Sequence, residues 1–198
     1  MNKITAIILA AGASQRMGTP KALLDFHGET FVARLTRVFA ATCDRVTVVL
    51  GNHVEEIRPR VPLRAQVVVN PDPSRGQLSS LQTALVELPA DADGFAFIPV
   101  DCPAVKEETA VALTRMFVER EPSTRFVIPR LGGKRGHPVF GDRGIADELL
   151  ALPATGEARE VVHRHVLNTQ YADVLDAGIF ADIDTPEAYR RLLEDSRA

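Results

Sequence analysis

Apolar and polar positions along the chain form two alternating patterns. The first is a short apolar run rich in Ile, Val and Phe, which is typical of a strand buried on both faces of a sheet. Five segments have it: ITAIIL at 4–9, RVTVVLG at 45–51, AQVVVN at 65–70, GFAFIPV at 94–100 and TRFVIPR at 124–130. The second has helical spacing and occupies residues 30–41, 77–88 and 107–120. This βαβ alternation predicts an α/β fold, with a mostly parallel sheet covered by helices on both faces.

The pattern becomes less regular beyond Leu131. It predicts a Gly-rich turn, a short strand at 137–140, helices around 146–152 and 157–164, and a final strand near 180–183. Thr185 followed by Pro186 is typical of a helix N-cap and first turn, so a last helix is expected to begin there.

Composition narrows the class of protein. With 198 residues, 45% of them hydrophobic, the chain is long enough for one sizeable core, and we expect a single domain over residues 1–198. A net charge of −3 and a pI near 6.0 argue against binding to nucleic acid, which requires a clustered basic excess. No apolar run is long enough to span a membrane and no signal peptide is recognisable, so we expect a cytoplasmic protein without a membrane partner.

Cysteines and histidines give no sign of a metal centre. Cys43 and Cys102 are too few and too distant for a disulfide framework or a zinc site, and both thiols are expected to be reduced. His53, His163 and His165 lack the spacing of metal ligands, so we interpret them as surface or packing residues.

The loop after the first predicted strand carries the strongest chemical signal. Residues 9–24 read LAAGASQRMGTPKALL, in which the only charges are the cations Arg16 and Lys21. Small side chains let the backbone approach a ligand and point N–H groups at it, so the loop suits an anion. It matches neither GxGxxG nor GxxxxGK[ST], which excludes the common dinucleotide and kinase-type phosphate loops. An ordinary strand-to-helix connection is the alternative interpretation.

Two other polar segments follow strands of the predicted sheet. NPDPSRGQLSSL follows the third predicted strand, and Asp101 follows the fourth. Ligands bind open α/β sheets at the carboxyl ends of the strands, so the cationic loop, the polar turn and the acid are expected to share one cleft. By itself, Asp101 could equally cap the turn before Pro103.

Five segments together resemble a known family. The opening loop is similar to the signature loop of nucleotidyltransferases that activate small molecules with NTPs, in particular the molybdenum cofactor cytidylyltransferases and their guanylyltransferase relatives. Four further segments resemble other motifs of this family and occur in the same order as in the family. They are RGQLSSLQTAL at 75–85, VDCP at 100–103, KRGHPVF at 134–140 and DIDTPEAY at 182–189. The resemblance implies a Rossmann-like three-layer α/β/α sandwich, the nucleotidyltransferase fold. It also implies an NTP-binding part at about 1–105 and an acceptor-binding part at about 106–198.

The resemblance implies an Mg²⁺-dependent reaction, in which an acceptor attacks the α-phosphorus of an NTP and pyrophosphate leaves. Arg16, Lys21 and Asp101 are the implied catalytic residues. The Arg16 fork can bind the β- and γ-phosphate oxygens, while Lys21 can place a compact charge at the α-phosphate. The implied nucleotide-binding residues are Leu9, Ala10, Ala11, Gly12, Ser14, Arg16, Lys21, Gly76, Gln77, Ser79 and Ser80.

Carboxylates are the candidate Mg²⁺ ligands, because this ion prefers hard oxygen donors. Asp101 is the first candidate, and the pair Asp182 and Asp184 is the second. These two alternate along the predicted last strand, so only one of them should reach the metal. Candidate acceptor-binding residues are Lys134, Arg135, Gly136 and His137, with a solvated turn as an equal alternative.

Ala11 bears on the choice of nucleotide. The guanine-using relatives usually carry a second glycine there, so the LAAG form resembles the pyrimidine-using branch and favours CTP, with molybdopterin as acceptor. The chain departs from the cytidylyltransferase pattern at Val100 and Cys102, which leaves open another small phosphorylated acceptor. The alternatives are a guanylyltransferase, a sugar-phosphate or alcohol-phosphate nucleotidyltransferase on the same fold, and a catalytically silent nucleotide-binding partner or chaperone of a molybdoenzyme.

Overall fold

The computed structural model describes residues 3–180 and 183–196. Within these residues the main sheet has the strand order β10-β7-β9-β6-β1-β4-β5, and β8 pairs with β7. Its strands are β1 (Ile4–Ala10), β4 (Arg45–Leu50), β5 (Gln66–Val69), β6 (Gly94–Pro99), β7 (Phe126–Leu131), β8 (Lys134–Arg135), β9 (Val139–Asp142) and β10 (Thr169–Asp173). β6, β1, β4 and β5 are parallel neighbours, whereas β9 runs antiparallel to both β6 and β7. The sheet is therefore mostly parallel, as predicted.

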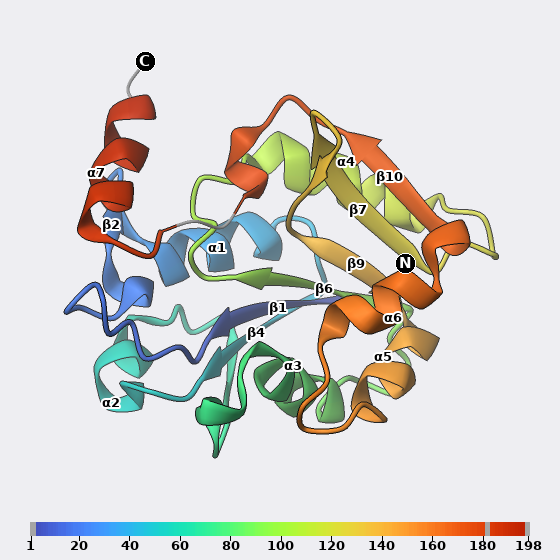
Figure 1. Cartoon of the computed structure of the whole chain (residues 1–198), viewed down its shortest axis with the longest axis horizontal. Helices are drawn as coiled ribbons and strands as arrows, with labels where there is room; N and C mark the ends of the chain where they lie inside the picture. Colours follow the sequence, from blue (N-terminus) through green and yellow to red (C-terminus); the bar gives the residue numbers. More distant parts are fainter. Residues whose placement is uncertain (1–2, 181–182, 197–198) are drawn as a thin grey trace.

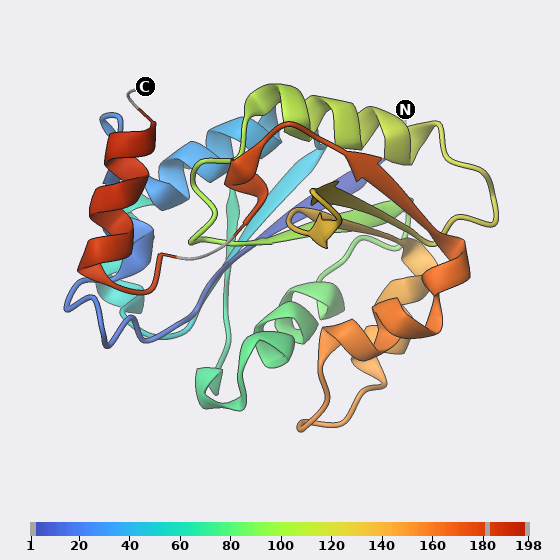
Figure 2. The same cartoon turned by 45° about the horizontal axis from the view of Figure 1, so that its top comes forward.

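Helices cover both faces of this sheet (Figure 1). The turned view shows α1 (Phe31–Ala40) and α4 (Glu107–Val118) on one side of the sheet, with α3 (Gln77–Val86), α5 (Arg143–Leu150) and α6 (Ala158–Arg164) on the other (Figure 2). α7 (Pro186–Asp195) packs at the end of α1, where the rings of Phe31 and Tyr189 make an edge contact. Short elements complete the fold: α2 (Val54–Ile57) and the hairpin of β2 (Asp25–Phe26) and β3 (Glu29–Thr30).

Two hydrophobic cores fill the space between the three layers. Every residue of β1 is buried, and its side chains alternate between the cores. Ala6 and Ile8 join the core beneath α1 and α4, while Ile7 and Leu9 join the core beneath α3 and α5. A strand buried on both faces needs apolar residues at every position, which explains the continuous apolar run in the sequence. Within the described ranges, no helix combines the length and apolar character that crossing a membrane requires.

The structure differs from the sequence prediction at both edges of the sheet. β5 was predicted to be buried on both faces, but it is an edge strand, with Val69 40% exposed. β10 was not predicted, because TQYAD has no apolar run and only Ala172 of its residues is buried. An edge strand has one neighbour and little covering, so it needs few apolar side chains.

A last strand is predicted near 180–183. Phe180 and Ile183, the described residues of this segment, are not in a strand. Residues 181–182, which include the candidate metal ligand Asp182, lie outside the described residues. The preceding residues form the 3-10 helix η5 (Ala177–Ile179) instead. η5 packs closely on the loop after β6, because a Cβ at Gly178 would lie 2.6 Å from the Val105 backbone nitrogen. The last helix begins as predicted: the Thr185 side chain accepts a hydrogen bond from the Ala188 N–H at 3.2 Å, and Pro186 opens the first turn.

Gly51 joins the end of β4 to the loop after β1. A Cβ at this position would lie 2.8 Å from the Pro73 Cβ and 2.9 Å from the Ala11 Cβ. Both neighbours are held by backbone rather than by flexible side chains. The absence of a side chain at residue 51 therefore permits the close approach of three loops at the carboxyl edge of the sheet.

Replacing Gly51 by alanine should lower the free energy of unfolding by roughly 1–3 kcal/mol, the usual range for overpacking a closed contact. Urea denaturation measures this loss. Gly12→Ala is the matched control, because an added Cβ there meets no atom within 4 Å, and its effect should stay within about 0.5 kcal/mol. Equal stability of the Gly51→Ala variant and the wild type would show that the three loops separate readily.

Candidate active site

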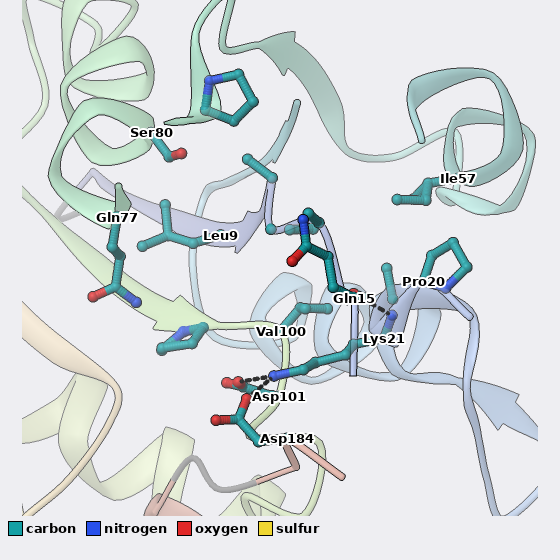
Figure 3. Close-up of a pocket in the computed structure, with 18 of the residues that line it drawn as sticks. Leu9, Gln15, Pro20, Lys21, Ile57, Gln77, Ser80, Val100, Asp101 and Asp184 are labelled. Atoms are coloured by element: carbon teal, nitrogen blue, oxygen red, sulfur yellow. Dashed lines mark hydrogen bonds and ion pairs between the residues drawn. The ribbon is translucent and has the colours of Figure 1, made fainter. Parts of the chain in front are cut away.

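A cleft of about 610 Å³ lies at the carboxyl ends of β1 and β6 (Figure 3). One wall is the loop after β1, and the other walls are the start of α3 and the turn after β6. Its lining includes residues 9–16, 20–22, 76–77, 80 and 99–101, together with Asp184. The three segments that were expected to share a cleft therefore do so.

Backbone contacts hold the loop after β1 in place. The Ala11 carbonyl accepts hydrogen bonds from the Asn52 backbone N–H at 3.2 Å and from its side-chain amide at 2.8 Å. The His53 imidazole lies 3.3 Å from the Ala13 carbonyl oxygen through Nε2. Across the loop, the Ser14 hydroxyl accepts a hydrogen bond from the Lys21 N–H at 3.0 Å, and Ser14 itself has a φ of 51°. Asn52 was not identified from the sequence, because a single polar residue in a turn carries no pattern.

The charged groups of the cleft form one cluster. The Lys21 ammonium donates a hydrogen bond to Asp101 Oδ2 at 3.0 Å and a second one to Asp184 Oδ1, as the dashed lines in Figure 3 show. Arg16 reaches the other oxygen of the Asp184 carboxylate at 2.7 Å. Lys21 and Asp101 are mostly buried, whereas Arg16 and Asp184 face solvent at the rim. Asp184 thus comes from the far end of the chain to join residues from the segments that follow the first and fourth predicted strands.

The cluster perturbs the ionisation of its members in opposite directions. Burial alone would lower the pKa of Lys21, but hydrogen bonds and charge from Asp184 and Asp101 outweigh burial and raise that pKa above its ordinary value. A hydrogen bond from Lys21, assisted by the charges of Lys21 and Arg16, outweighs partial burial and lowers the pKa of Asp184. Both groups are therefore charged at neutral pH.

The two carboxylates suit a divalent metal. Asp101 Oδ1 is buried and has no hydrogen-bond partner among the described residues, which is the state of an acceptor reserved for another ligand. Asp184 faces the same ammonium as Asp101, so the two carboxylates converge. Within the described ranges, the cleft included, no group of three or more His, Cys, Asp or Glu residues could hold a metal, so a metal in the cleft would depend on these two carboxylates. Two carboxylates are enough for Mg²⁺, which keeps waters and bridges substrate phosphates.

Most of the implied nucleotide-binding residues line the cleft. These are Leu9, Ala10, Ala11, Gly12, Ser14, Arg16, Lys21, Gly76, Gln77 and Ser80. Ser79 does not line the cleft. Its hydroxyl accepts a hydrogen bond from the Asn70 amide at 2.8 Å and donates one to the Gly76 carbonyl at 2.8 Å. It holds the turn before α3 rather than facing the cleft. Gln15 and Pro73, which the sequence did not single out, also line the cleft.

The implied acceptor-binding residues are spread over different surroundings. Lys134 and Arg135 lie on the exposed hairpin of β8 over the rings of Phe180 and Tyr171, and neither lines the cleft. Gly136 is a packing residue, because a Cβ there would lie 2.6 Å from Ile179 Cγ1.

His137 does not line the cleft either, but the charge of Asp101 acts on it. Its ring makes an edge contact with Phe97 at a centroid separation of 5.6 Å, and its Nδ1 is buried without a hydrogen-bond partner in the described part of the chain. Burial lowers the His137 pKa, although the Phe97 backbone and the Asp101 charge oppose this shift. His137 is therefore neutral at pH 7.

Comparison with known proteins identifies the family to which the chain is similar. A family model described as a MobA-like NTP transferase domain matches residues 6–170. The chain is 27% identical over 205 residues to a protein of Bacillus cereus (strain AH820) named "Probable molybdenum cofactor guanylyltransferase", and the match covers 98% of both chains. It is 30% identical over 203 residues to the nicotine blue oxidoreductase of Paenarthrobacter nicotinovorans, with 96% of both chains covered.

Solved structures share the fold of this chain. The crystal structure of Rv0371c from Mycobacterium tuberculosis H37Rv is 31% identical, covers 98% of both chains and superposes with a TM-score of 0.84. The same protein, in a structure described as a complex with manganese, gives a TM-score of 0.79 at 28% identity. The match of the family model over most of the chain, together with the cleft found at the carboxyl edge of the sheet, shows that the chain belongs to the MobA-like NTP transferase family of nucleotidyltransferases.

Proposed function

We propose that this chain transfers a nucleoside monophosphate from an NTP to molybdopterin, or to a closely similar phosphorylated acceptor, and releases pyrophosphate. The observation that carries the proposal is the cluster of Lys21, Asp101 and Asp184 in the cleft. Nucleotidyl transfer requires dense negative charge to be held and neutralised, and this cluster places a buried cation between two carboxylates beside a loop of small residues.

The residues of the cleft divide the work of the proposed reaction. Backbone N–H groups of the loop 11–14 would bind the triphosphate, since small side chains leave them accessible. Arg16 would bind the departing β- and γ-phosphates with its fork, and Lys21 would stabilise charge on the α-phosphate. Asp101 and Asp184 would hold Mg²⁺, which neutralises phosphate charge and orients the α-phosphorus when it is bound. Positioning and charge neutralisation then supply most of the rate enhancement.

The donor nucleotide is proposed to be GTP. The supporting observation is that several relatives matching 98% of the chain are named "Probable molybdenum cofactor guanylyltransferase". CTP, favoured by the family resemblance at Ala11, is the second candidate. Its physical support is that Ala11 lines the cleft and that its methyl group occupies space that a glycine at this position would leave free.

Two other functions remain as alternatives. The first alternative is an oxidoreductase, which the name of the Paenarthrobacter relative suggests. The second, suggested by the sequence, is a nucleotide-binding protein that has no catalytic activity itself and acts as partner or chaperone of a molybdoenzyme. Neither alternative requires Lys21, Asp101 and Asp184 to lie together, whereas the proposed nucleotidyl transfer uses all three residues. The retained cluster is therefore the reason to prefer transfer.

A panel of four NTPs tests the donor. In the presence of Mg²⁺, GTP should raise the melting temperature most, because a ligand that binds only the native state stabilises it by mass action. Pyrophosphate release with molybdopterin should follow the same order. A larger response to CTP would favour cytidylyl transfer, and an equal response to all four would mean that only the triphosphate is held. Oxidation of a reduced nicotinamide without pyrophosphate release would favour the oxidoreductase.

Asp101→Asn separates catalysis from nucleotide binding. The substitution keeps the size of the side chain and removes its charge, so pyrophosphate release should be abolished while part of the nucleotide affinity remains through Arg16 and Lys21.

Arg16→Ala should lower turnover by a factor on the order of 100, as removal of one transition-state donor commonly does. Asp91→Asn is the control, because Asp91 is exposed, pairs with Lys3 and does not line the cleft. Undiminished turnover of Asp101→Asn would favour the binding-protein alternative.

The ion cluster also predicts a pH dependence of stability. The pKa of Asp184 is lowered in the fold, so its ion pairs stabilise the native state above its ordinary value of 3.8 and are lost as the pH falls through the lowered value. The pKa of Lys21 is raised, so the Lys21 contribution persists up to its ordinary value of 10.5 and is lost as the pH rises beyond it. Asp184→Asn should therefore be less stable than the wild type by a constant amount between about pH 5 and 9.

Urea denaturation at stepped pH measures this difference, which should shrink below about pH 4 as the wild-type carboxylate becomes protonated. Asp147→Asn, an exposed carboxylate on α5, is the control and should show a smaller loss. A difference between Asp184→Asn and the wild type that stayed constant down to pH 2 would contradict the ion-pair account.

A further inference from the structure

A second cavity, of about 470 Å³, opens beside the cleft. Gly76 and Gln77 line both spaces, so the start of α3 forms their common border. Figure 3 shows the Gln77 side chain on the side of the cleft away from Pro20, extending toward β6. Its amide makes no hydrogen bond to the described residues. We call the second space the side cavity.

The floor of the side cavity is apolar and partly aromatic. Phe97, Leu78 and Leu81 line it, and all three are buried in the core beneath α3. The Phe97 ring is held between the rings of Phe95 and His137, at centroid separations of 6.4 Å and 5.6 Å. A fixed aromatic ring beside two leucines suits the face of a planar heterocycle.

Two arginines stand on the walls of the side cavity. Arg75 belongs to the 3-10 helix η3 (Pro73–Arg75) before α3, and Arg159 belongs to α6. The Arg75 guanidinium makes no hydrogen bond or ion pair with any described residue, while Arg159 pairs with Glu157. Glu157 is also the one acid among the lining residues, so the walls keep a positive excess. Arginine forks bind phosphate and other delocalised anions bidentately.

The reaction itself limits where an acceptor can lie. Its phosphate must reach the α-phosphorus beside Lys21 and Asp101, and the rest of the molecule must extend away from the triphosphate. The loop after β1 bounds the cleft on one side, and the opening past Gly76 and Gln77 leads to the side cavity on the other. The β8 hairpin with Lys134 and Arg135 lines neither space.

We propose that the side cavity binds the body of the acceptor, a planar heterocycle with anionic substituents, over Phe97 and between Arg75 and Arg159. Gln77 lies at the shared opening, next to the acceptor phosphate. This inference rests on the proposed nucleotidyl transfer and names the subsite that would serve it. Arg75 and Arg159 are specificity-determining residues for the acceptor, and the nucleotide does not contact them.

Steady-state kinetics test this assignment with Arg75→Gln, Arg159→Gln and the double variant. The KM for molybdopterin should rise about tenfold or more in the double variant, while the KM for the NTP stays within about twofold, because two charge-assisted contacts are lost from one substrate only. Arg164→Gln is the matched control, since Arg164 is an exposed arginine of the same helix that does not line the side cavity. A rise in the KM for the NTP instead would assign the cavity to the nucleotide base and overturn the proposal.

Direct binding makes the result independent of turnover. The probe is pterin-6-carboxylate, an anionic pterin whose own fluorescence anisotropy reports binding. The wild type and Arg164→Gln should bind it, and the double variant should bind it about tenfold more weakly or not at all. Binding by the double variant equal to that of the wild type, or no binding by the wild type, would overturn the subsite. Failure of the proposed function is a different result: no pyrophosphate release by the wild type with any NTP, whatever the probe shows.

Discussion

Strand β1 is hydrogen-bonded in parallel to β4 on one side and to β6 on the other, and this pairing determines where the cleft forms. Parallel strands end at the same edge of a sheet, so the loops that follow them are brought together there. Lys21, which follows β1, meets Asp101, which follows β6, at 3.0 Å although eighty positions separate them in the chain. The continuous apolar character of β1 secures the pairing, because both faces of the strand are covered by a core.

The loop after β1 is held by neutral contacts, and its two cations remain available. Asn52 holds the loop through the Ala11 carbonyl, and Ser14 closes it onto the Lys21 backbone. Neither contact uses the side-chain charge of Arg16 or Lys21. Those charges face the carboxylates of Asp101 and Asp184. In the proposed reaction the cations would bind phosphate and the carboxylates would hold the metal. Preorganised charge of this kind is effective in catalysis because it needs no reorganisation during the reaction.

The second part of the chain returns to the first at two places. Asp184 comes back to Lys21 from the segment before α7, and the loop before α6 brings Arg159 toward Arg75 and the start of α3. Antiparallel β9 accounts for the second return. Its last residue, Asp142, pairs with Gly94 at the start of β6, so α5 begins at the edge opposite the cleft and lies on the side of the sheet where α3 lies. The proposed acceptor subsite therefore lies between segments that are far apart in sequence. The division into parts at about 1–105 and 106–198 stays a prediction.

Sequence by itself determined the α/β class, the buried strands, the helices from 30 to 120 and the composition of the loop after β1, because each follows from local periodicity or from residue type within one segment. It also indicated Asp101 and Asp184, through family motifs. Tertiary structure alone decided the edge strand β10, the 3-10 helix η5 that precedes Phe180, and the packing role of Gly136. It also decided that Ser79 faces Asn70 and that Asn52 holds the loop. These features depend on which distant segments come into contact, and a pattern within one segment does not record that contact.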